Sequence, residues 1–266
     1  MTERWIKLEG AVNVRDLGGL PTRDGRTTRF GRVLRADNLQ DLTERDIDRL
    51  VGTIGVSDVL DLRSGVEVRS EGPGPLSGFD GVVTHHLSLY REKPPSDTNG
   101  DGAVLPDDVL PWLRPGDDDV QIWNSTGLYY TKYLFRRPDS VVTALRKLSM
   151  SAGASIVHCA AGKDRTGVIC ALALSVADVE RDAIVADYEA TGERLRDILR
   201  RLAATETYGY TVDEDVIDSH YPRAEVMETF LNYVDKELGG PLTWLAEQGW
   251  TDKDTATLRD RLLASE

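Results

Sequence analysis

Cysteine and histidine are scarce in this chain, and basic residues are outnumbered by acidic ones. Its 266 residues include two cysteines and four histidines, and 32 lysines and arginines face 45 aspartates and glutamates. Because Cys159 and Cys170 lie in or beside strongly apolar segments, the sequence predicts reduced thiols without a disulfide framework, as in a cytosolic protein. The net charge of −13 leaves no broad cationic face for a polyphosphate backbone, so we expect no nucleic acid partner.

Long apolar runs are also missing. No run approaches the ~18 apolar residues that a membrane span needs, and the opening MTERWIKLEG lacks the basic and apolar regions of a signal peptide. The sequence therefore predicts a cytoplasmic protein without an integral membrane segment. Secretion by a route that needs no signal peptide stays open.

Short β-rich runs alternate with helical patterns over most of the chain. Residues 11–39 have the glycine, proline and Asp-Gly punctuation of a hairpin that leads into a sheet. The segment 41–55 has a capping pair, Thr43 and Asp46, and a stop at Gly55, which together predict a helix. The other predicted strands are 56–64, 82–89 and 154–159. Helical patterns follow Pro138, the last of these strands and residue 180, so the order predicts an α/β fold with a central, mainly parallel sheet flanked by helices.

Residues 91–119 break this rhythm. They are rich in proline, glycine and aspartate, which predicts a flexible insertion. Within it, Asp97, Asn99 and Asp101 are placed as in a calcium loop, but the last ligand position holds Asp108 instead of glutamate, and prolines deny the segment an entering helix. A solvated loop is the preferred interpretation, and calcium binding is the alternative.

The segment SIVHCAAGKDRTGVI, residues 155–169, predicts a strand, a tight loop and a helix. This geometry aims backbone N–H groups and the positive end of the helix at one place, which favours an anion. The nucleotide-binding pattern fails, because Val157 and Asp164 stand where it requires glycine and a hydroxyl residue. Zinc is disfavoured too, since no second cysteine or histidine pair lies at motif spacing from His158 and Cys159. We expect neither a metal nor a cofactor at this loop.

A reactive thiol is the remaining interpretation. Loop amides, the helix dipole and Arg165 all favour the thiolate of Cys159, which is the nucleophilic form. The same field binds a phosphate dianion, and the planar fork of Arg165 matches two equatorial oxygens of a phosphoryl group. Thiol attack then gives a phosphocysteine. The hydroxyl of Thr166 can donate to the thiolate that departs when water resolves this intermediate.

The sequence HCAAGKDRTG resembles the Cys-x5-Arg signature of cysteine-dependent protein tyrosine phosphatases. Its Lys-Asp pair is similar to that of a bacterial and mycobacterial group that acts on phosphotyrosine, other phosphoresidues and phosphoinositides. Three further segments resemble the same group: NVRDLGG at 13–19, VLDLRS at 59–64 and ADYEAT at 186–191. Together these segments span most of the first 200 residues.

The resemblance implies a protein tyrosine phosphatase-like fold and a set of roles in the loop. Cys159 would be the nucleophile, Arg165 the phosphate clamp, and Lys163 a further anion contact that favours phosphoinositide head groups. The implied substrate-binding residues are Ala160, Ala161, Gly162, Lys163, Thr166 and Gly167.

Two aspartates compete for the role of general acid, which gives the leaving oxygen its proton. The resemblance suggests Asp164, inside the loop, as acid and then base. Asp80 stands before a predicted strand and would fit the movable acid loop of the more familiar phosphatases. We favour Asp164, because its place next to Arg165 guarantees proximity, whereas Asp80 needs a loop to close. A purely structural ion pair for Asp164 stays open.

Several polar residues outside the loop are candidates to support it. Arg15 and Asp16 are placed to brace the phosphate loop, beside glycines that serve a turn. Asp61 and Arg63 stand at a strand end on the expected active-site edge, where substrate contact and a structural ion pair are both open. His158 precedes the nucleophile and is placed to support its thiolate.

We therefore expect a single phosphatase domain over 1–266. Its core would cover about 1–205, and a carboxyl-terminal helical subdomain, acting as a lid or cap, about 206–266. The amphipathic run 190–204 fits either core packing or a lid over an apolar cleft.

The expected reaction is metal-free hydrolysis of phosphotyrosine, with phosphoserine, phosphothreonine or phosphoinositides as additional substrates. The partner would then be a phosphorylated protein or a phosphoinositide. Two alternatives are a catalytically silent phosphate-recognition module and a thiol redox enzyme. The second would want a partner thiol, and Cys170, inside a buried helix, is badly placed for that role.

Overall fold

The computed structural model describes residues 3–91, 125–209 and 214–264. Nearly all of the insertion predicted at 91–119, including its calcium-like segment, lies outside these residues.

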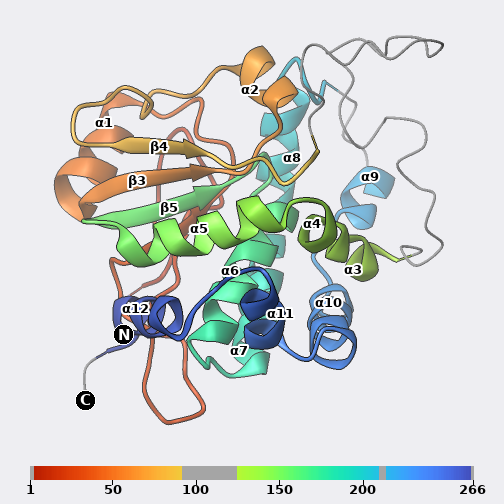
Figure 1. Ribbon diagram of the computed structural model, residues 1–266. Helices are drawn as coiled ribbons and strands as arrows, with labels where there is room; N and C mark the ends of the chain where they lie inside the picture. The colour runs from red at the N-terminus through yellow and green to blue at the C-terminus, as the bar shows by residue number, and fades with distance from the viewer. Residues whose placement is uncertain (1–2, 92–124, 210–213, 265–266) are drawn as a thin grey trace, which may run out of the picture.

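A five-stranded sheet lies at the centre of the described chain, in the order β1-β2-β5-β3-β4 (Figure 1). Its strands are β1 (Arg15–Asp16), β2 (Val33–Ala36), β3 (Val56–Asp61), β4 (Val83–His86) and β5 (Ala154–His158). Strands β2, β5, β3 and β4 run parallel, and β1 pairs antiparallel with β2. The predicted α/β architecture with a mainly parallel sheet is confirmed.

Helices cover both faces of the sheet. Successive side chains of a strand point to opposite faces, so one strand contributes to the cores on both sides. In the fully buried β5, Val157 joins the larger apolar core together with residues of α5 (Pro138–Met150) and α6 (Asp164–Val176). Ile156 belongs to a second core on the opposite face, which also contains Leu50. A strand buried on both faces reads as a continuous apolar run, which is the pattern that the sequence shows before Cys159.

The helical segment between β2 and β3 follows the predicted signals closely. Thr43 Oγ1 accepts from the backbone N–H of Asp46, whose carboxylate accepts from the N–H of Thr43, so the pair forms a complete capping box. The segment starts as α1 (Glu44–Ile47), continues as the π-helical η1 (Asp48–Ile54) and ends at Gly55, whose φ is +80°. The predicted helix over 41–55 is confirmed, with a wider winding in its second half.

Two helical regions have no predicted counterpart. Helix α2 (Gly65–Glu71) lies between β3 and β4. The second half of this connection is rich in glycine, so the sequence indicated a loop there. Helices α3 (Thr126–Tyr129) and α4 (Thr131–Arg136) precede α5. Both regions matter for the site, because each places a polar side chain beside the loop that follows β5.

The chain beyond residue 180 is mainly helical, as predicted. Its elements are α7 (Arg181–Glu189), η4 (Ala190–Arg194), α8 (Leu195–Ala203), α9 (Glu214–Ser219), α10 (Ala224–Glu237), α11 (Pro241–Glu247) and α12 (Asp252–Leu262). Helices α10 to α12 put Phe230, Trp244 and Leu258 into the larger core, on the side of α5, α6 and α7. Figure 1 shows α8 away from this group, beyond the carboxyl ends of the parallel strands. None of the helices in the described ranges combines the length and apolarity that a membrane crossing requires.

Candidate active site

The loop between β5 and α6 lies at the carboxyl edge of the parallel strands. Strand β5 ends at His158 and α6 begins at Asp164, so Cys159 to Lys163 form the whole connection. The side chain of Cys159 is buried, and Arg165 lies in the first turn of α6. Ligands bind at this edge in open α/β sheets, because helix N-termini and loops converge there.

Backbone carbonyls of the loop bond to groups behind it. These hydrogen bonds run from Asn38 N to Ala160 O at 2.8 Å, from Asn13 Nδ2 to Ala161 O at 3.0 Å, and from Arg35 Nη2 to Gly162 O at 2.8 Å. In a trans peptide the N–H points opposite to the C=O. The N–H groups of Ala161, Gly162 and Lys163 are therefore turned toward the open side of the loop, where they can bind an anion.

Gly162 has a backbone conformation that other residues rarely adopt. Its φ is +66°, and a Cβ at this position would stand 2.4 Å from the carbonyl oxygen of Ala36. Only glycine therefore allows the loop to turn this closely over β2.

Arg165 is held by a carboxylate. Its Nη1 and Nη2 donate to Oε2 and Oε1 of Glu67 at 2.6 and 2.9 Å, and both side chains are almost fully buried. Tyr208 donates its hydroxyl hydrogen to Glu67 Oε1 at 2.5 Å and accepts from Arg165 Nη2 at 3.3 Å. Burial would lower the pKa of Arg165, but the charge of Glu67 raises it well above its usual value, so the guanidinium stays charged.

Glu67 owes its position to the start of α2. The N–H and the hydroxyl of Ser64 both donate to Glu67 Oε2, at 2.7 and 2.8 Å, and Ser64 Oγ accepts from the N–H of Glu67. This capping box orients the carboxylate toward Arg165. Burial would raise the pKa of Glu67, but the charge and hydrogen bonds of Arg165 lower it, so Glu67 is ionised.

Asp164 is the first residue of α6, and its side chain is 33% exposed. Tyr130, at the junction of α3 and α4, donates its hydroxyl hydrogen to Asp164 Oδ1, and Lys163 Nζ lies 3.6 Å from the same oxygen. Lys163 Nζ also donates to the carbonyl of His220 at 3.0 Å. The structure thus brings Asp164 to the same cleft as Cys159 and Arg165.

Asp80, the competing candidate acid, lies elsewhere. It is exposed and precedes β4, whose amino end pairs with the early part of β3. Because β4 and β5 are parallel, the residues before β4 lie at the edge opposite to the loop that follows β5. Asp80 does not line the cleft that contains Cys159.

Behind the loop, three arginines surround one buried carboxylate. Arg15 Nε and Arg35 Nη1 lie 3.2 and 2.5 Å from the carboxylate of Asp187 in α7, and Arg4 pairs with it as well. Burial would raise the pKa of Asp187, but these three charges hold it well below its usual value. Arg15 also donates to Asn13 Oδ1 at 2.5 Å, so the cluster fixes two groups that bond to the loop carbonyls, Arg35 and Asn13.

The other residues predicted to support the loop have hydrogen bonds and ion pairs of their own. Asp16 accepts from the N–H groups of Gly18 and Gly31 and holds the β1–β2 connection. Asp61 and Arg63 form a buried ion pair at 2.6 Å, and Arg63 Nη2 donates to the carbonyl oxygen at the end of α2. His158 Nε2 lies 3.7 Å from Asp61 Oδ1, and its Nδ1 lies 3.3 Å from the carbonyl oxygen of Cys159. Burial lowers the pKa of His158 to about 4, so its ring is neutral at neutral pH.

A cleft of about 530 Å³ opens over the loop. Its floor includes Cys159, Ala160, Ala161, Lys163, Asp164 and Arg165. Its walls include Leu195, Leu199 and Leu202 of α8 and the tyrosines Tyr90, Tyr129, Tyr130 and Tyr208. Helix α8 is tied to the loop after β2, because Arg201 pairs with Asp37 and with Asp41. The apolar face of α8 thus serves both packing and the cleft wall.

Thr166 and Gly167 complete the predicted set. Thr166 is fully buried, and its hydroxyl oxygen has no hydrogen-bond partner among the described residues. Gly167 packs against the ring of Tyr188, which a Cβ would approach to 3.1 Å.

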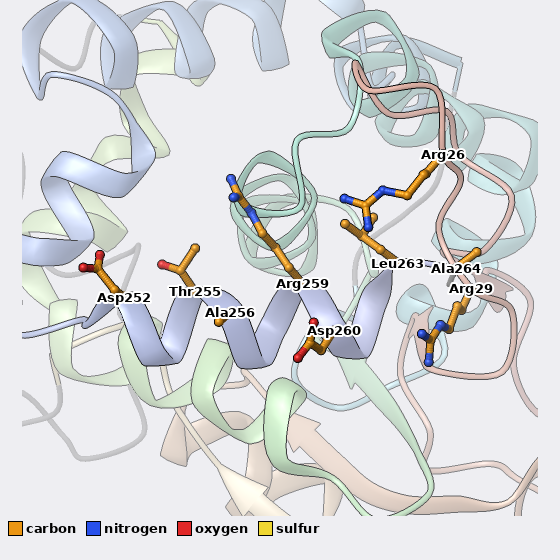
Figure 2. Close-up of a pocket in the computed structure, with 9 residues that line it drawn as sticks. All are labelled: Arg26, Arg29, Asp252, Thr255, Ala256, Arg259, Asp260, Leu263 and Ala264. Carbon is orange, nitrogen blue, oxygen red and sulfur yellow. The ribbon is translucent and has the colours of Figure 1, made fainter. Parts of the chain in front are cut away.

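Another hollow, of about 570 Å³, lies between α12 and the turn before β2 (Figure 2). Arg26, Arg29 and Arg259 line it together with Asp252 and Asp260. It shares no residue with the cleft over the loop, and two of its cations are engaged: Arg26 with Asp24, and Arg259 with the carbonyl of Val176. Within the described ranges, no group of three or more His, Cys, Asp or Glu side chains is arranged to hold a metal ion.

Comparison with known proteins points to one family. The model of the tyrosine phosphatase family matches residues 6–264. The chain is 30% identical over 212 residues to the triple specificity protein phosphatase PtpB of Mycobacterium tuberculosis, a match that covers 74% of this chain and 72% of the relative. It is 29% identical over 185 residues to a protein of Cupriavidus necator whose name describes a tyrosine-protein phosphatase, with 68% and 61% of the two chains covered.

Proposed function

The chain belongs to the tyrosine phosphatase family, and from that premise we propose that it hydrolyses phosphomonoesters in two steps through a phosphocysteine at Cys159. One observation carries this proposal. The cleft floor combines a buried thiol, a charged arginine and a carboxyl group around a loop whose carbonyls are bonded away from the cleft. We also propose that the whole chain is one phosphatase domain, because the family model matches residues 6–264.

In the first step the Cys159 thiolate attacks phosphorus in line with the leaving oxygen. The S–P bond forms as the P–O bond to the leaving group breaks, and Asp164 transfers its proton to that oxygen. Arg165 and the loop N–H groups bind the three equatorial oxygens, where charge is spread in the transition state. Glu67 accepts from both Nη atoms of Arg165 and so fixes the position of the guanidinium at the cleft.

In the second step water attacks the phosphocysteine. Asp164, now a carboxylate, takes a proton from the water, the P–S bond breaks, and inorganic phosphate leaves with Cys159 again as thiolate. Thr166 is the candidate donor to this departing sulfur, because its buried hydroxyl has no other partner among the described residues. Its hydrogen bond would stabilise the thiolate as leaving group.

Phosphotyrosine on a protein is the lead substrate. The apolar side chains of α8 and the tyrosines of the cleft wall suit an aromatic ring above the loop. The relative from M. tuberculosis is named as a triple specificity phosphatase, which supports phosphoserine and phosphothreonine as further substrates. Lys163 adds a second cation at the cleft, which suits a phosphoinositide head group as well.

Turnover of an aryl phosphate in the presence of a chelator tests the proposal. We expect hydrolysis by the wild type, none by Cys159→Ser, and normal rates for Cys170→Ser, whose buried thiol is the matched control. Burial raises the pKa of Cys170 to about 11, which disfavours it as a redox partner. Activity that survives in Cys159→Ser would remove the mechanism, and tight phosphate binding without any turnover by the wild type would favour a silent recognition module.

A further inference from the structure

The two oxygens of the Asp164 carboxyl group have different surroundings. Oδ1 accepts from Tyr130 and lies 3.6 Å from the ammonium of Lys163. Within the described ranges, the hydrogen bond to the Asp164 carboxylate goes to Oδ1, and none is formed with Oδ2. The side chain is one-third exposed and lines the cleft, so Oδ2 is the oxygen free to meet a leaving group.

We propose that Tyr130 is a positioning residue for the general acid: its hydroxyl occupies Oδ1 of Asp164, so that the transferable proton resides on Oδ2, toward the leaving oxygen. The inference rests on the proposed role of Asp164. It concerns which oxygen holds the proton and how the carboxyl group is turned, and it assigns Tyr130 no contact with substrate.

A chain of hydroxyls fixes the direction of this hydrogen bond. Tyr130 Oη and Tyr188 Oη lie 2.8 Å apart. A phenol has one hydrogen, and since that of Tyr130 goes to Asp164, Tyr188 must be the donor between the two tyrosines. Successive hydrogen bonds in such a chain polarise one another, so the donation from Tyr188 strengthens that from Tyr130 to Asp164.

Tyr130 is also a donor that keeps its hydrogen. Burial, and then the charge of Asp164, raise the pKa of Tyr130 well above its usual value. A proton placed on Oδ1 would face both the hydroxyl hydrogen of Tyr130 and the ammonium of Lys163. Electrostatics therefore favours Oδ2 as the protonated oxygen.

Packing holds the hydroxyl of Tyr130 in place. The side chains of Tyr130 and Tyr188 are almost fully buried, and their rings meet edge to face with centroids 6.3 Å apart. Tyr133 and Phe230 pack on the same ring at 6.2 and 6.3 Å. The side chain of Asp164 is one-third exposed, so packing restrains it less than it restrains these rings, and the hydrogen bond from Tyr130, together with the contact to Lys163, fixes the orientation of its carboxyl group.

A series of aryl phosphates with graded leaving-group acidity separates this role from a structural one. The kcat/KM value reports formation of the phosphocysteine, and an acidic phenol can leave without a proton. We expect Tyr130→Phe to lower kcat/KM about tenfold for phenyl phosphate, a part of the ~100-fold to 10,000-fold that a general acid supplies. For a strongly acidic phenol we expect almost no change. Asp164→Asn should steepen the leaving-group dependence further, and Tyr130→Phe should add nothing in that background.

Two more variants serve as a control and as a second test. Tyr133→Phe removes a buried hydroxyl from the same segment, one that lies 3.3 Å from Tyr90 Oη and not at Asp164, and it should keep the wild-type leaving-group dependence. Tyr188→Phe should also steepen the dependence of kcat/KM on leaving-group acidity, but less than Tyr130→Phe does. This variant tests the chain of hydroxyls even if Tyr130→Phe folds poorly.

Three outcomes would overturn the inference. The first is that Tyr130→Phe lowers kcat/KM equally for all leaving groups. The second is that kcat/KM depends on leaving-group acidity in the same way in Tyr130→Phe and in Tyr133→Phe. The third is an unchanged dependence in Asp164→Asn, which would remove the general acid as well. An altered dependence in Asp164→Asn alone would leave the proposed function standing without the role of Tyr130.

Discussion

Arg165 and Glu67 form a two-bond ion pair although they stand 98 residues apart in the sequence. The guanidinium that would clamp a phosphoryl group is thus oriented by the first turn of a short helix, α2, on a different part of the sheet edge. Arg165 and Glu67 are both buried, so neither can turn away without leaving a charge unpaired.

Replacement of Glu67 tests this arrangement. Hydrogen bonds to charged groups contribute about 1.5–3 kcal/mol, so we expect Glu67→Gln, which keeps shape but loses charge, to lower kcat/KM by about 10-fold to 100-fold. Glu71→Gln is the matched control on the same helix, since its carboxylate accepts from the N–H of Thr207 and does not meet Arg165. Steady-state kinetics on phosphotyrosine checks both, and equal rates for Glu67→Gln and Glu71→Gln would contradict the orienting role.

The conformation of Gly162 gives a second prediction. An alanine there would meet both the cost of a positive φ, about 1–2 kcal/mol, and a clash of its Cβ with the carbonyl oxygen of Ala36. We expect Gly162→Ala to lose most activity and to lower the free energy of unfolding by more than the cost of φ alone.

Gly25→Ala separates the two effects. Gly25 has φ +86°, and a Cβ added to it would have no neighbouring atom within 4 Å. This variant should lose only about 1 kcal/mol and keep full activity. Denaturant unfolding and turnover measure both variants, and normal activity in Gly162→Ala would mean that the loop shape is not required.

Much of the site was predictable from local sequence. Cys159, Asp164 and Arg165 fall within seven residues, and a strand followed by a tight loop and a helix necessarily gathers them at one edge. The capping pair of Thr43 and Asp46 and the stop at Gly55 were likewise local, and the structure has both.

The partners of the loop were not predictable in this way. Arg35 reaches the loop from β2, Asp187 in α7 holds Arg35, and Glu67 in α2 holds Arg165. Pairings between such distant segments depend on the tertiary fold. A local signal for Glu67 was nevertheless present, because Ser64 and Glu67 have the spacing of a capping box. Tyr129 and Tyr130 lie where α3 ends and α4 begins, and these two short helices were not predicted from the sequence.

The cluster around Asp187 predicts a large effect on stability. Asp187→Asn would leave Arg4, Arg15 and Arg35 without a compensating charge, and breaking a buried ion pair costs about 3–5 kcal/mol. Asp235→Asn, which breaks the exposed pair with Arg181, should cost at most about 1 kcal/mol. Urea unfolding at neutral pH compares them, and similar midpoints would contradict a structural role for the cluster.

Buried His158 predicts how stability depends on pH. Burial lowers its pKa from 6.5 to about 4, so between these values the unfolded chain binds a proton that the folded chain does not. The free energy of unfolding should therefore fall as pH drops from 6.5 toward 4, by about 3 kcal/mol for this group.

The check is urea unfolding of the wild type and His158→Asn at pH 7 and pH 5. The variant should lose less stability over this interval than the wild type does. His220→Asn is the comparison variant. Burial and the charge of Lys163 lower the pKa of His220 as well, so His220 also makes the folded chain less stable as the pH falls. Parallel losses in the wild type and His158→Asn would show that His158 is not the group responsible.

The most direct test of the mechanism is to trap its intermediate. In Asp164→Asn, an aryl phosphate with a strongly acidic phenol should still phosphorylate the thiol, while the second step lacks its base. Mass spectrometry of protein quenched during turnover is then predicted to find one phosphoryl group on the peptide that contains Cys159. Turnover with Cys159 unmodified, or with the phosphoryl group on another residue, would contradict the account.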